Sequence, residues 1–194
     1  MRRRTFDALA TATGILLAVV LLVAGVLLTW GHSFVNNEVH TQLAAQQIYF
    51  PASSSPAIKA PEFAAMHQYA GQLMTTGAQA EVYADHFIAN HLKVIGGGKT
   101  YAQLSTQSLA QPKNTALAGQ VQTVFRGETL RGLLLNAYAF WEMGQIMLVA
   151  AIAAFAAAGL MLILSGLGVF HLRRATPEAE IFPQLATRVE VAAS

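Results

Sequence analysis

Ala8–Trp30 reads ALATATGILLAVVLLVAGVLLTW and Met143–Phe170 reads MGQIMLVAAIAAFAAAGLMLILSGLGVF, and neither run contains a charged residue. A helix rises about 1.5 Å per residue, so about 20 apolar residues cross the roughly 30 Å hydrocarbon core of a bilayer. Both runs exceed that length. They predict two transmembrane helices, with a segment of mixed sequence, residues 31–142, between them.

Basic residues flank the outer ends of the two runs. Arg2, Arg3 and Arg4 precede the first run, and Arg173 and Arg174 follow the second. Because Lys and Arg are enriched in short cytoplasmic segments, both termini are expected in the cytoplasm. The membrane that the two runs cross is expected to be the plasma (inner) membrane. Residues 31–142 are then extracytoplasmic.

The first run is predicted to be an uncleaved signal anchor. Its apolar stretch is longer than the roughly 7–15 residues of a cleavable signal, and residues 28–32 offer no cleavage site with small residues. The expected organisation is a cytoplasmic N-terminus (1–7), transmembrane helix 1 (8–30), an extracytoplasmic helical domain (31–142), transmembrane helix 2 (143–170) and a cytoplasmic tail (171–194).

The composition narrows the range of functions. Hydrophobic residues make up 54% of the chain and charged residues 11%, against about 25% charged residues in an average soluble domain. The net charge is only +2 and no basic stripe or cluster is recognised in residues 31–142, so we expect no nucleic-acid partner. The chain has no cysteine, which excludes disulfides, thiolate catalysis and cysteine metal ligands.

Residues 31–142 carry helical spacing and recognisable breaks, but no alternation of period two. Thr76 with Gln79, and Thr100 with Gln103, have the spacing of capping boxes that begin helices. The predicted helices are 34–48 as a stalk, one begun by Pro61 and ended by Gly77, one from Thr76 to the glycines 96–98, a short one to Ala110, and one from Thr115 through the second span. The fold class is therefore all-α, with two transmembrane helices and a small extracytoplasmic helical bundle inserted between them.

Two motifs that resemble ligand sites have simpler readings. The stretch GGGKT, residues 96–100, lacks the earlier glycine and the strand of a phosphate-binding loop, so the glycines are interpreted as a helix end. Glu81 and Asp85 lie four apart on one helix face, where they either share a cation or form a solvated surface.

His67 and His91 lie on the apolar stripes of two successive predicted helices. If the helices pack face to face, the two imidazoles can meet and bind a metal ion or sense pH. The other interpretation is two separate, hydrogen-bonded core histidines.

The segment Phe125–Trp141 combines charges, glycines and aromatic residues. Glu128 and Arg131 are three apart on an otherwise apolar seam and can form an ion pair. The pair suits close contact with another helix, in this chain or in a partner, or a local bridge at the base of the domain. The residues chosen as a candidate interaction site are Arg126, Glu128, Arg131 and Glu142.

Residues near the ends of the runs suit a bilayer boundary. Trp30, Tyr138 and Trp141 have the amphipathic rings that settle at membrane interfaces. Within the spans, small residues recur four apart, a spacing that favours close helix packing. They are Gly14 and Ala18 in the first run, and Ala150, Ala154 and Ala158 in the second.

Three segments, ADHFIANHL (Ala84–Leu92), GGKTY (Gly97–Tyr101) and Phe125–Trp141, resemble a family of uncharacterised two-span membrane proteins of actinobacteria. The likeness covers nearly the whole chain except the tail, and it implies no established activity. Members sometimes carry a name that implies an aromatic ring-opening dioxygenase. Such an enzyme needs two histidines and a carboxylate around open metal positions, whereas the histidines here are scattered over separate helices, so the sequence does not support that name.

The sequence thus predicts a non-enzymatic integral membrane protein without a cofactor, an accessory subunit whose extracytoplasmic domain docks on another envelope protein or complex. Its expected partners are the lipid bilayer and a membrane protein or a second copy of the chain. The alternative is an extracytoplasmic ligand, metal or pH sensor that uses His67 and His91 and acts through a partner.

Overall fold

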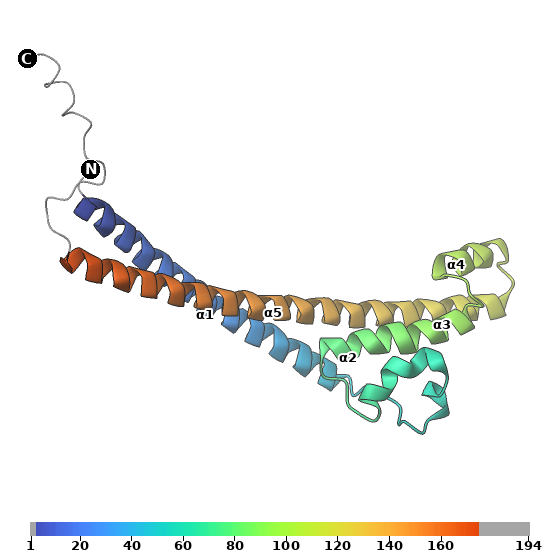
Figure 1. The fold of residues 1–194 in the computed structure, drawn as a ribbon. Helices are drawn as coiled ribbons and strands as arrows, with labels where there is room; N and C mark the ends of the chain where they lie inside the picture. The colour runs from blue at the N-terminus through green and yellow to red at the C-terminus, as the bar shows by residue number, and fades with distance from the viewer. Residues whose placement is uncertain (1–2, 175–194) are drawn as a thin grey trace, which may run out of the picture. The chain divides into compact units, whose positions relative to one another are not determined.

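The computed structural model describes residues 3–174, which are helical almost throughout (Figure 1). The predicted all-α class is confirmed for this part of the chain, where only an isolated bridge between Tyr49 and Leu73 pairs extended backbone. Arg2 and the tail from residue 175 lie outside the described residues. The elements are α1 (Arg3–Ala45), η1 (Pro56–Ile58), η2 (Pro61–Tyr69), α2 (Gly77–Val82), η3 (Tyr83–Ile88), α3 (Ala89–Ile95), α4 (Tyr101–Ala110) and α5 (Thr115–Arg174).

The chain divides into two compact units. We call the first unit the helix pair; its described residues are those up to Thr29 on α1 and from Leu148 on α5. The second unit, Trp30–Met147, is the helical domain. Each unit is described separately below.

Both helices of the helix pair are long and apolar enough to cross a membrane. In the most apolar stretch of 18 residues, 17% of α1 and 11% of α5 is buried, whereas the core helix of a soluble protein is mostly buried. The exposed side chains are bulky and apolar, such as Leu16, Leu27 and Ile163. This surface suits a hydrocarbon environment.

Small and hydroxyl residues form the contact between the two helices of the pair. Thr11, Ala18 and Gly25 are buried on α1, and Ala151, Ala158 and Ser165 are buried on α5. Both sets repeat every seven residues, the period of left-handed packing in which one face stays turned to the partner helix. Of the small residues predicted in the two runs, Ala18 and Ala158 are fully buried and Gly14 lies against Ser165, while Ala150 and Ala154 are only partly buried.

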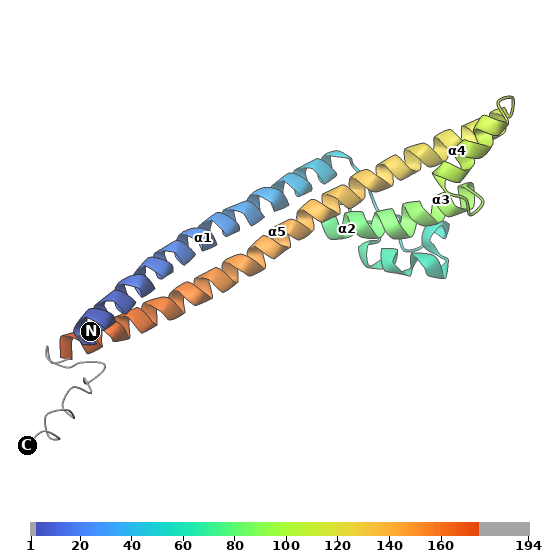
Figure 2. The ribbon, with the colours of Figure 1, turned by 90° about the horizontal axis from the view of Figure 1, so that it is seen from above.

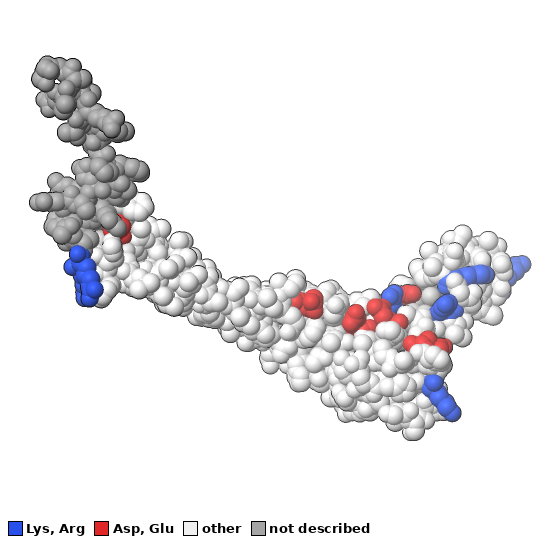
Figure 3. Space-filling view, in the orientation of Figure 1, with Lys and Arg blue, Asp and Glu red and all other residues white. Residues whose placement is uncertain are grey.

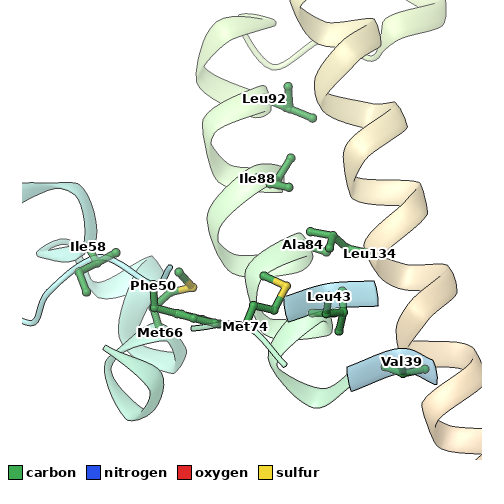
Figure 4. Packing of buried hydrophobic residues seen from close by; sticks show 11 residues of the cluster. Val39, Leu43, Phe50, Ile58, Met66, Met74, Ala84, Ile88, Leu92 and Leu134 are labelled. Atoms are coloured by element: carbon green, nitrogen blue, oxygen red, sulfur yellow. The ribbon is translucent and has the colours of Figure 1, made fainter. Parts of the chain in front are cut away.

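The core of the helical domain lies where α2, η3 and α3 pack against α5 (Figures 2 and 4). The two helical segments run antiparallel, because Gly77 at the start of α2 meets Trp141, and Leu92 in α3 meets Gly127. Phe50, Ile58, Met66 and Met74 add a buried layer from the segment between α1 and α2 (Figure 4). Glycine is required at position 77, because a Cβ there would overlap Trp141 Cβ and lie 2.6 Å from its Cγ.

The helix from Gly77 to Ile95 contains one wide turn, the π-helical element η3. The buried hydrophobic residues of this helix, Ala80, Ala84, Ile88 and Leu92, are each four apart. At about 100° per residue, four residues overshoot one turn by about 40°, so three such steps would drift by about 120°. A π turn holds more residues than an α turn, and it keeps all four side chains on the face that meets α5.

Several predicted helix limits are confirmed. Both capping boxes are formed: Thr76 caps α2 and Thr100 caps α4, each with the glutamine three residues on. Gly97 and Gly98 follow α3 with φ of 60° and 77°, a conformation that glycine adopts at no steric cost. A single helix of 60 residues runs from Thr115 through the second apolar run, as expected.

The predicted helix from Pro61 to Gly77 is wrong in its second half. The helix there is a 3₁₀ helix that ends at Tyr69, and Gly71 takes a φ of 73°. The following backbone is extended and pairs with the segment after α1, since Phe50 N–H donates to the Gln72 carbonyl (2.9 Å) and Met74 N–H to the Ile48 carbonyl (2.8 Å). Gly77 begins α2 instead of ending its predecessor, and the predicted stalk stops at Ala45.

Candidate functional site

Arg131 is the centre of a charged network in the helical domain. Its Nη2 donates to Asp85 Oδ1 at 2.7 Å, and its Nη1 lies 3.5 Å from Glu128 Oε2. The predicted Glu128–Arg131 pair is therefore present, three residues apart on α5. The stronger partner comes from η3, so the helix that Arg131 contacts belongs to this chain.

Asp85 was expected either to share a cation with Glu81 or to be solvated, and that expectation is wrong for Asp85. The π turn carries Asp85 onto α5, where it bonds the guanidinium. The hydrogen bond that Arg131 donates to Asp85 raises the pKa of Arg131, burial opposes that effect, and the nearby charges of Asp85 and Glu128 add to it. Arg131 thus stays a cation, and its network joins η3 to α5.

Two further carboxylates, Glu81 and Glu142, act on a tyrosine of α5. The negative charges of Glu81 and Glu142 raise the pKa of Tyr138. Figure 3 shows acidic side chains spread along this part of the domain. Within residues 3–174, no group of three or more histidine and carboxylate side chains is arranged to hold a metal ion.

A surface of opposite charge occupies the end of the helical domain formed by the end of α3, α4 and the start of α5. The sequence from His86 to Gly127 contains no acidic residue. Four basic residues fall in it and all are exposed: Lys93, Lys99, Lys113 and Arg126. We call this surface the basic tip; Figure 3 shows basic side chains gathered at that end of the domain.

The basic tip also exposes apolar side chains. Val94 and Leu109 are each 81% exposed, and Phe125 is 47% exposed beside Tyr101, with ring centroids 5.5 Å apart. Beneath them a small core of Leu104, Leu117, Val121 and Val124 holds α4 to α5. The tip is a folded surface that mixes positive charge with uncovered hydrophobic area.

The four residues of the candidate interaction site fall in different surroundings. Arg126 is exposed on the basic tip. Glu142 is also exposed, but it lies at the opposite end of the part of α5 that belongs to the helical domain. Glu128 and Arg131 are engaged with each other and, through Arg131, with Asp85. Sequence reasoning missed the basic tip, although the run of 42 residues without an acid was readable from the sequence alone.

His67 and His91 lie on elements that do pack together, but an aromatic residue fills the contact. Phe63 of η2 stacks near His91, with centroids 5.5 Å apart, and His91 Nδ1 lies 2.7 Å from the carbonyl of Phe87 in its own helix. Both histidines are exposed, so the interpretation as core histidines is wrong.

The two tryptophans differ. Trp30 is 67% exposed and stacks on Phe34, as suits an interfacial ring. Trp141 is partly buried against Gly77 in the domain core, so its packing inside the protein explains its presence.

The candidate site consists of the basic tip and the neighbouring Arg131 network. Comparison of the chain with protein-family models, with curated proteins and with solved structures found no match.

Proposed function

We propose that this chain is a non-enzymatic integral membrane protein that serves as an interaction subunit in the cell envelope. It crosses the plasma membrane twice, keeps both termini in the cytoplasm and holds the helical domain outside. The domain docks through its basic tip on an acidic surface of another envelope protein. The resemblance to two-span actinobacterial proteins belongs to the same proposal.

Two features support the membrane part. Only 17% and 11% of the most apolar stretches of α1 and α5 are buried by the rest of the chain, and so much apolar surface is costly in water and favourable in lipid. Arg173 and Arg174 follow the second run after two residues, and Arg2, Arg3 and Arg4 precede the first run, the distribution typical of cytoplasmic flanks.

The separation of charge within the domain is the observation on which the docking part rests. Between Asp85 and Glu128 the chain carries four positive charges and no negative one, and it leaves Val94, Leu109 and Phe125 uncovered beside them. Exposed apolar residues with a charged rim are typical of protein-binding surfaces, and complementary charge speeds and orients the encounter. An acidic partner surface therefore fits the tip.

The test is co-purification of the full chain in mild detergent after crosslinking in its native membrane, with charge reversal at the tip. Lys113→Glu with Arg126→Glu should weaken the association at least about tenfold, or about 1.4 kcal/mol, and raised salt should weaken it further. Lys59→Glu is the matched control, because Lys59 is an exposed lysine of the same domain away from the tip. Recovery of the monomer alone, or equal losses in the tip and Lys59 variants, would refute the proposal.

A further inference from the structure

A groove of about 600 Å³ runs along the helical domain between α1 and α5. Val39, Leu43 and Leu134 form its buried floor. Its rim includes Phe34, Leu133 and Phe140, which are 54%, 63% and 50% exposed. Neither the Arg131 network nor the basic tip contributes a residue to this groove.

The dimensions of the groove suit a single hydrocarbon chain. Its lining follows α1 from Phe34 to Leu43, about 14 Å at the helical rise per residue, and continues past the end of that helix to Gln46 and Ile48. The groove is thus elongated, with an apolar floor, and an extended acyl chain can lie along it.

The chemistry of the lining also favours a lipid. The lining contains one charge, that of Glu38, and its other polar groups are the amides of Gln42, Gln46 and Asn136. No cation is present to receive the carboxylate of a free fatty acid. Amide groups can donate to the ester carbonyls of a phospholipid, and the anionic Glu38 disfavours a free acid.

The position of the groove in the sequence gives a lipid a route to it. Phe34 follows the first apolar run by four residues in the unbroken helix α1, and Phe140 precedes the second run by three residues in α5. An acyl chain that enters the groove from the adjoining leaflet moves from the apolar interior of the bilayer into an apolar groove. The driving force is then the removal of Phe34, Leu133 and Phe140 from water.

We infer that this groove holds one acyl chain of a phospholipid from the leaflet that adjoins the helical domain. The inference rests on the membrane-crossing part of the proposed function. It assigns to the domain a second binding partner besides the protein that docks on the basic tip.

The experiment places the full chain in vesicles of phosphatidylcholine and phosphatidylglycerol that contain a phosphatidylcholine with a diazirine near the end of one acyl chain. After photolysis, peptides are mapped and the label on residues 34–48 and 130–140 is divided by the label on residues 8–30. Substantial groove label is expected in the parent chain. Ala137→Trp, which fills the groove, should lower the ratio about tenfold, or about 1.4 kcal/mol.

Ala139→Trp is the matched control, because Ala139 is exposed on the same helix outside the groove, and it should leave the ratio unchanged. Leu133→Gln, at an exposed rim position, should also lower the ratio without burying a larger side chain. Label confined to residues 8–30, or equal ratios in Ala137→Trp and Ala139→Trp, would overturn the inference. So would stronger groove labelling by a free diazirine fatty acid. Absence of label from residues 8–30 would instead refute the membrane insertion on which the proposed function depends.

Discussion

Gly77→Ala tests how closely α2 and α5 approach each other. An added methyl group would overlap Trp141 Cβ and lie 2.6 Å from Cγ, whereas such carbons normally stay more than 3.0 Å apart. These Trp141 atoms are fixed close to the α5 backbone, so the side chain cannot swing away. One helix must move instead.

The expected cost comes from overpacking. Forcing an extra carbon into a packed core costs about 1–3 kcal/mol, and the better helix propensity of alanine returns at most about 1 kcal/mol. A net loss of about 1–2 kcal/mol lowers the melting temperature of a domain of this size by about 5–10 °C.

Tryptophan fluorescence provides a local assay. The chain has two tryptophans, so a Trp30→Phe background leaves Trp141, the residue in contact with Gly77, as the reporter. Thermal unfolding would be followed in mild detergent. Gly132→Ala is the control on α5, because nothing lies within 4 Å of its added carbon, and its melting temperature should be unchanged or higher. If Gly77→Ala has the same melting temperature as the parent, the close approach of the two helices is wrong.

Three further predictions concern other contacts. A double-mutant cycle with Arg131→Met and Asp85→Asn should give a coupling free energy of unfolding of about 1 kcal/mol, near the upper end of the range for partly exposed ion pairs. The coupling should be smaller in high salt. Zero coupling in denaturant titrations would contradict the ion pair. Burial raises the pKa of Tyr83 above its ordinary value, so its contribution to stability is complete below about pH 10 and is lost as pH rises further. When the pH is raised from about 8 to about 11, the melting temperature of Tyr83→Phe should therefore fall less than that of the parent. In the helix pair, cysteines at Thr11 and Gly168 should form a disulfide when the purified protein is treated with an added oxidant, since their Cβ atoms would lie 3.5 Å apart and the chain has no other cysteine. Moving the α1 cysteine to the next residue should abolish the crosslink, and efficient crosslinking of that pair would exclude the proposed register.

The sequence predicted the features that depend on neighbouring residues. The capping boxes at Thr76 and Thr100 use side chains three residues apart, and the end of α3 depends on consecutive glycines, so both were readable. The helix begun at Thr115 continued because no breaker interrupts its apolar spacing.

Features that depend on contacts distant in the sequence were not predicted. Apolar spacing from Phe63 to Met74 suggested one helix, but backbone pairing with the segment after α1 made its second half extended. The bond from Arg131 to Asp85 spans 46 residues, and the π turn that brings them together has no local signature. The groove needs two helices that are adjacent only in the folded domain.

The wide turn at Tyr83–Ile88 has the form of a one-residue insertion in an otherwise regular helix. Deleting one residue there would restore ordinary helical phase and rotate everything that follows by about 100°. Leu92 would then leave Gly127, and the residues beyond it, including the lysines that lead into the tip, would point in new directions. A single-codon deletion in this segment is thus a change of phase that reorients the binding end of the domain while leaving its helical content almost intact.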